Sequence, residues 1–105
     1  MSEELQDRFA ALSGGTKRML EYVAVLDGEA RYAILRHLAR VSEEDMVEDV
    51  KEAVDAGIIA VRPGEPNVYE FTEASVREWV LSQIGETRLP KLRARAAAAR
   101  WRVVG

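Results

Sequence analysis

The stretch "VSEEDMVEDVKEAVDAG", residues 41–57, decides how the rest of the chain is interpreted. Ser42 suits a helix N-cap, and acids in the turn after it are favoured by the positive end of the helix dipole. Gly57 is typical of the residue just past a helix C-terminus. Five apolar residues fall at helical spacing and predict one buried face: Met46, Val47, Val50, Ala53 and Val54. The stretch therefore predicts a helix over 42–56.

The remaining surface of this predicted helix is strongly acidic. Seven carboxylates against the single Lys51 give residues 42–56 a net charge of −6, and the segment holds no Arg, Asn or Gln. Duplex DNA is bound mainly through Lys and Arg, and bases are read by Arg, Lys, Asn or Gln. Base reading by this helix is therefore not expected.

Helical periodicity also precedes the acidic stretch. Leu5, Phe9 and Leu12 indicate a short lead-in helix within 2–12. A second helix is expected over about 15–27, with Ser13 or Thr16 as its N-cap, and a third over about 31–40. The residues between them, 28–31, are expected to be a short link.

After Gly57 the pattern changes to that of a β-hairpin. The segments 58–63 and 68–72 are rich in β-branched and aromatic residues, and "GEPN" (64–67) between them favours a turn. Helical periodicity then returns over 73–85, and Pro90 suits the first turn of a last, basic helix over about 89–102.

Three helices, a hairpin and further helix is the order of a winged helix-turn-helix domain. We therefore expect a mainly α fold with a three-helix core, a β-hairpin wing and one or two additional C-terminal helices. One domain is expected over 1–105, with a lead-in segment at 1–14, the winged-helix core at 15–72 and C-terminal helices at 73–105. In that architecture the third helix is the one that can enter a DNA major groove.

Composition narrows the class of protein. The 105 residues contain no cysteine, so disulfides, thiolate catalysis and thiolate zinc sites are excluded. No apolar run approaches the roughly 18 residues of a membrane helix, and the acidic start is unlike a signal peptide, so a cytoplasmic protein without membrane contact is expected. The charge is unevenly distributed along the chain. Residues 86–105 hold six bases and one acid, for a net charge of +5, so residues 1–85 must carry −8 to give the total of −3.

No constellation of residues indicates an enzyme. "SGGTK" (13–17) lacks the spacing of a phosphate loop and is interpreted as the start of a helix. His37 is the only histidine, and with no cysteine a zinc site is not expected, so it is interpreted as a surface or half-buried helix residue. Trp79 is expected in the core. For Trp101 three positions stay open: exposed to solvent, covering the edge of the domain, or part of an interface with a neighbouring protein. No cofactor, metal or catalytic residue is expected.

Several segments resemble the winged-helix domain of STAND-type signalling ATPases, such as the bacterial ATPase regulators of the LuxR and MalT type. The resemblance covers about 8–97 and is carried by the motifs in their shared order: "LSGGTKRMLEYVAVLDGEA", "VSEEDMVEDVKEAVDAGII", "VYEF", and "FTEASVREWVL" with "RLPKLRARAA".

The resemblance implies a domain that follows a nucleotide-binding module and packs on it instead of binding DNA. In part of the class a histidine after the wing strand touches the nucleotide phosphate, and Thr72 stands there. A second family histidine is replaced by Arg93. Thr72 is therefore expected to cap the helix that begins at Glu73 rather than to bind a cofactor.

The sequence thus favours a non-catalytic regulatory or protein-interaction domain of a STAND-like ATPase acting in signalling or transcription regulation. Its partner would be a protein, or the neighbouring ATPase module, with a basic surface, and nucleic acid would be contacted, if at all, through the basic tail. Two alternatives stay open: a free-standing winged-helix DNA-binding regulator, and a charge-polarised homo-oligomer. The residues expected to carry protein interaction are Glu44, Glu48, Glu52, Asp55, Arg88, Lys91 and Arg95.

Overall fold

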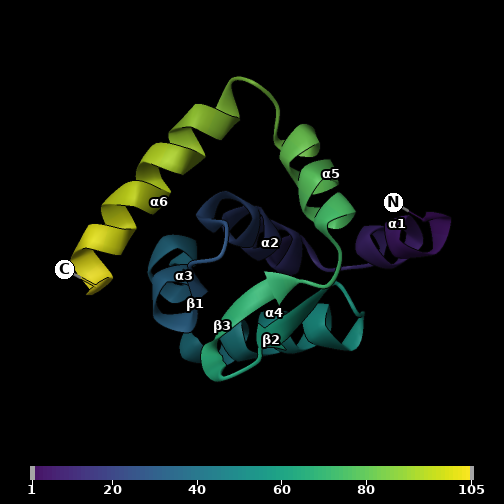
Figure 1. The fold of residues 1–105 in the computed structure, drawn as a ribbon, viewed down its shortest axis with the longest axis horizontal. Coiled ribbons are helices and arrows are strands. Elements are labelled where there is room, and N and C mark those ends of the chain that lie inside the picture. Colours follow the sequence, from purple (N-terminus) through teal and green to yellow (C-terminus); the bar gives the residue numbers. More distant parts are fainter. Residues whose placement is uncertain (1, 105) are drawn as a thin grey trace.

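The structure is a computed structural model that describes residues 2–104, with side chains through Arg102; Met1 and Gly105, the ends of the expected domain, lie outside the described residues. The described part forms a mainly α domain with six helices and a small antiparallel sheet (Figure 1). The elements, in chain order, are α1 (Glu3–Ala10), α2 (Gly14–Leu26), β1 (Ala30–Arg31), α3 (Tyr32–Ala39), α4 (Glu43–Asp55), β2 (Ile59–Arg62), β3 (Glu65–Phe71), α5 (Ala74–Ile84) and α6 (Arg88–Val104).

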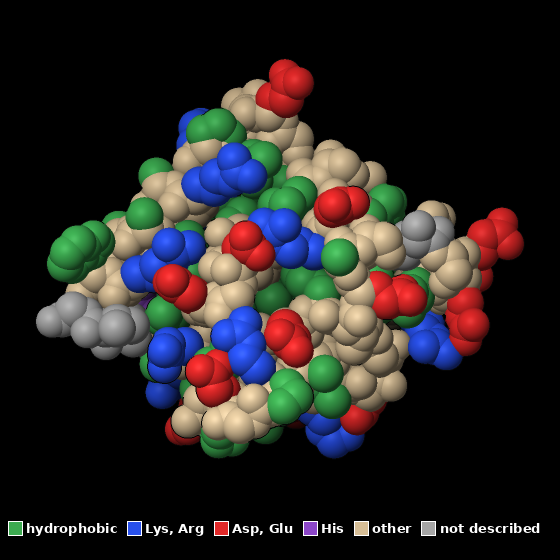
Figure 2. All heavy atoms as spheres, in the orientation of Figure 1, with side chains coloured by type: hydrophobic (Ala, Val, Ile, Leu, Met, Phe, Trp, Pro, Cys, Tyr) green, Lys and Arg blue, Asp and Glu red, His purple; other side chains and the backbone are tan. Residues whose placement is uncertain are grey.

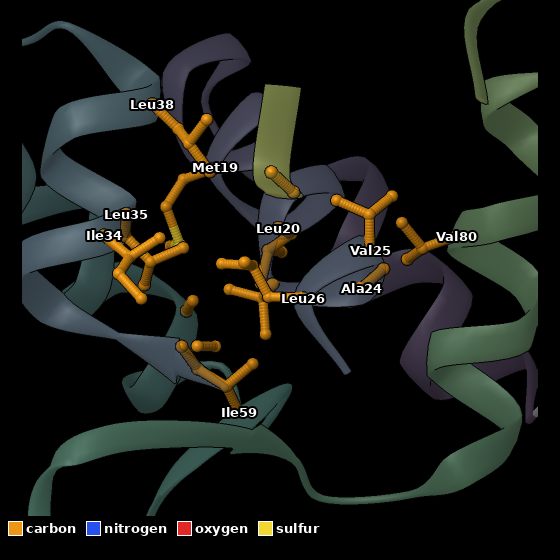
Figure 3. Packing of buried hydrophobic residues seen from close by; sticks show 14 of the residues in the cluster. Met19, Leu20, Ala24, Val25, Leu26, Ile34, Leu35, Leu38, Ile59 and Val80 are labelled. Carbon is orange, nitrogen blue, oxygen red and sulfur yellow. The ribbon is translucent and has the colours of Figure 1, made fainter. Parts of the chain in front are cut away.

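Helix α2 lies at the centre and contacts α3, α4, α5 and α6. Its capping residue is Ser13, whose hydroxyl accepts a hydrogen bond from the Thr16 N–H. Side chains from α3 and β2 face Met19, Leu20 and Leu26 of α2, and Val80 of α5 lies beside Val25 of the same helix (Figure 3). Met19, Leu20 and Leu26 are at most 1% exposed, so α2 organises the apolar core.

The sheet has the order β1-β3-β2 and includes the expected hairpin. Ala30 of β1 pairs with Tyr69, and Ile59 of β2 pairs with Phe71. The predicted link at 28–31 was wrong, because two of its residues add an edge strand to the sheet. The predicted turn was also displaced: Gly64 takes a φ of +79°, and the chain already pairs again at Glu65.

Helix α4 confirms the helix predicted from the acidic stretch. The Ser42 hydroxyl accepts a hydrogen bond from the Asp45 N–H, and Gly57 follows with a φ of +75°. The predicted apolar face was too wide. Met46, Val50 and Ala53 are buried, whereas Val47 and Val54 are 52% and 37% exposed because α2 and the sheet cover only one stripe of α4.

Helices α5 and α6 turn back over α2, and α6 then runs beside α3 (Figure 1). Leu92, Ala96 and Ala99 form the buried stripe of α6. Trp79 of α5 is half-buried rather than fully in the core, and its ring packs edge-on against Phe9 at a centroid distance of 4.8 Å. No helix among residues 2–104 has the length and apolarity needed to span a membrane.

Candidate protein-interaction surfaces

The first surface is the outward side of α4 near its N-terminus. We call Glu43, Glu44, Val47 and Glu48 the acidic face of α4; all four are exposed and line one shallow hollow. The dipole of α4 stabilises acids in its first turn, which accounts for Glu43 and Glu44. Glu48 lies beyond that turn and Val47 is apolar, so the dipole explains neither. The acidic face therefore combines exposed apolar surface with carboxylates that have no basic partner among the described residues.

The C-terminal half of α4 is closer to electrical balance. Asp55 accepts a hydrogen bond from Lys51 at 2.6 Å, and both side chains are exposed. An exposed pair of this kind contributes little to stability. Of the acids predicted to meet a partner, Asp55 is thus already paired, while Glu44 and Glu48 are not.

Glu52, predicted to meet a partner, instead contacts the start of α2. Its Oε1 accepts hydrogen bonds from the Ser13 N–H and hydroxyl, both at 3.0 Å. Next to it, the buried Thr16 hydroxyl donates to Asp49 at 3.2 Å. These contacts join α4 to the N-terminus of α2, so Glu52 and Asp49 serve the packing of the two helices.

The two carboxyls in this cluster respond to their surroundings in opposite directions. The polar groups of Thr16 and Ser13 at the start of α2 lower the pKa of Glu52. Only Ser13 lies within hydrogen-bond distance of Glu52, so we attribute the lowering to Ser13. Burial raises the pKa of Asp49, against the opposing effect of its hydrogen bond from Thr16.

Replacing Glu52 by Gln is expected to destabilise the fold in a pH-dependent way. Because the pKa of Glu52 is lowered on folding, its carboxylate stabilises the fold above the ordinary value of 4.5, and this contribution is lost as pH falls through the folded value. We expect Glu52→Gln to cost about 1 kcal/mol at neutral pH. Urea unfolding at pH 7 and in acid measures the free energy of unfolding of both chains. The difference between Glu52→Gln and the unsubstituted chain should be smaller in acid than at pH 7. A difference of the same size at both pH values would contradict the assignment.

The predicted basic residues of α6 are engaged to different degrees. Arg88 donates two hydrogen bonds to Glu21, at 2.9 and 3.3 Å. Arg95 donates to the Leu38 carbonyl at 3.4 Å and lies over the Tyr22 ring, 5.6 Å from its centroid. Lys91 is exposed. The structure does not bring these bases to the acidic face of α4, since α2 and α3 lie between α6 and α4 (Figure 1).

Thr72 does not cap the following helix, which corrects the sequence-based prediction. The capping position of α5 is Glu73, and no side chain caps it. The Thr72 hydroxyl instead donates to the Gly57 carbonyl at 2.7 Å and approaches the Ile58 carbonyl at 3.3 Å. It therefore holds the end of the hairpin against the loop that follows α4.

Two features were not predicted from the sequence as parts of a site. His37, interpreted as a surface or half-buried helix residue, is exposed and lines a cavity with Arg40 and Arg102. Trp101, whose position was left open, is 80% exposed. Helical periodicity could have placed Arg95 and Arg102 on one flank of α6, but only the packing of α6 on α3 brings them near Arg40.

Comparison of the chain with protein-family models, curated proteins and solved structures finds no match.

Proposed function

We propose that the chain is a winged-helix regulatory domain that docks through the acidic face of α4 onto a basic protein surface. The fold part of the proposal is supported by element order: α2, β1, α3, α4 and the β2-β3 hairpin follow the helix and strand order of a winged helix-turn-helix domain. In this assignment α4 is the third helix and the hairpin is the wing.

The observation that carries the proposal is the surface of α4 at the place where such a domain would meet DNA. Glu44, Val47 and Glu48 occupy that surface, and a duplex would present phosphates to them. Repulsion disfavours that contact. Arg62 of the hairpin does not compensate, since its guanidinium is engaged by Glu65 at 3.1 Å and Glu70 at 3.3 Å.

The same surface suits a partner that is basic and partly apolar. Covering the exposed Val47 with a partner would remove its apolar surface from water, which favours binding. The carboxylates around Val47 favour Lys or Arg side chains at the rim of the contact. A module that precedes this domain in a longer chain, as in the STAND-type ATPases that the sequence resembles, would present such a surface at high effective concentration. The domain would then regulate by packing, without catalysis or cofactor.

A titration with two probes tests this function. The first probe is an amphipathic helical peptide with leucines on one face and arginines beside them, and the second is a random-sequence DNA duplex. We expect saturable peptide binding that weakens as salt is added, because the charges that steer the encounter are screened. Tighter binding of the duplex, with a steep salt dependence, would favour the DNA-binding regulator instead.

A further inference from the structure

A second surface feature lies on the other side of the molecule, between the end of α3 and the last turns of α6. A cavity of about 190 Å³ is bordered by His37, Arg40, Arg95 and Arg102, and its remaining lining is Leu38, Ala98 and Ala99. No carboxylate is among these described lining residues. The two alanines keep the space between the arginines open, because larger side chains on α6 would fill it.

The charge around this cavity is positive even after the helix ends are counted. The C-terminal ends of α3 and α6 each contribute about −0.5 of a charge through their dipoles. Three arginines, which stay charged at any ordinary pH, outweigh these partial charges. Arg40 and Arg102 have no salt-bridge partner among the described residues. Lys and Arg side chains lie over α6 and α3 on the left of Figure 2, with acids interspersed.

We propose that this cavity is an anion site that takes a phosphate group of a small molecule, which we call the α3–α6 phosphate site. Guanidinium groups match phosphate oxygens with two parallel N–H donors, and Arg40 and Arg102 approach from different helices. The cavity is smaller than the roughly 300–1,000 Å³ of typical ligand pockets. It therefore fits one or two phosphates and leaves the rest of a ligand outside. This site is independent of the acidic face of α4.

Arg40 offers a sharp test because of its backbone conformation. It ends α3 at a φ of +54°, and its N–H donates to the Arg36 carbonyl at 3.1 Å. Glycine is the residue favoured in this left-handed position, because a Cβ atom is strained there. Arg40→Gly therefore removes the charge while relieving the backbone, and we expect it to fold at least as stably as the unsubstituted chain.

The experiment is a titration of the ¹⁵N-labelled protein with inorganic pyrophosphate at constant ionic strength. We expect saturable chemical-shift changes at His37, Arg40 and Arg102, and at least a fivefold loss of affinity in Arg40→Gly and in Arg102→Gln. Arg93→Gln is the matched control, because it removes the same charge from an exposed residue on the opposite flank of α6. Its affinity should stay within twofold of the unsubstituted chain.

Three outcomes would overturn the proposal. Equal loss of affinity in Arg93→Gln would show diffuse attraction to a basic helix. A linear, non-saturating response to pyrophosphate would show that no site exists. A DNA duplex that binds tighter than pyrophosphate, and is weakened by Arg40→Gly, would assign the cavity to a nucleic-acid backbone. The first two results do not bear on peptide binding by α4. The third is told apart by Arg40→Gly, because duplex binding that this variant weakens lies in the cavity and not on α4.

Discussion

Replacing Leu20 by alanine is expected to lower the free energy of unfolding by about 3 kcal/mol. Leu20 is fully buried on α2, the helix that α3, α4, α5 and α6 surround. Because Leu20 has neighbours on several sides, the surrounding helices cannot move in far enough to fill the space that its side chain leaves. A loss of this size is a large fraction of the 5–15 kcal/mol that stabilises an ordinary domain.

Urea unfolding followed by circular dichroism measures this loss. Val47→Ala is the matched control, because Val47 is 52% exposed and its truncation should change the free energy of unfolding by less than about 0.5 kcal/mol. The same experiment tests the correction to the predicted apolar face of α4. If Val47→Ala destabilised the fold as much as Leu20→Ala, Val47 would have to be part of the core after all.

Reversing two charges on the acidic face of α4 is expected to weaken docking at least tenfold, or about 1.4 kcal/mol. Glu44→Lys with Glu48→Lys turns attraction for a basic partner into repulsion at the exposed surface beside Val47. Among the described residues neither side chain forms a hydrogen bond or salt bridge with α2, whereas reversing Glu52 would also disturb the packing of α4 against α2. The affinity for the arginine-flanked peptide, measured by fluorescence anisotropy, checks the result.

The control is a reversal of two acids elsewhere. Glu78→Lys with Glu86→Lys makes the same change in net charge at exposed positions in α5 and in the loop after it. We expect the control to keep its affinity for the peptide within about twofold. An equal loss in both variants would mean that the peptide responds to net charge, and the acidic face would have no special role.

Much of the fold follows from local sequence patterns. Ser13, Ser42 and Gly57 mark helix ends through chemistry that acts over a few residues, and the structure confirms each. The two-residue strand β1 was missed because Ala30 and Arg31 carry no strand signal of their own. Their extended conformation depends on pairing with Tyr69 and Val68, almost forty residues later in the chain.

The surfaces were less predictable, because they depend on which faces the packing covers. Periodicity assigned Val47 and Val54 to the buried side of α4, but it cannot measure how wide a stripe the neighbouring elements cover. Glu52 has the same sequence character as Glu48, yet only Glu52 reaches Ser13. The cavity beside Arg40 exists only because α6 packs along α3.

The most direct test of the proposed function is to map where the arginine-flanked peptide binds. In a titration of the ¹⁵N-labelled protein, we predict that the largest amide shift changes fall on Glu44, Val47, Glu48 and Lys51, and that they saturate. The α3–α6 phosphate site should show little change, because it is positively charged. Saturable changes centred on any other surface, or no saturable binding at low salt, would contradict the account of α4 as a docking helix.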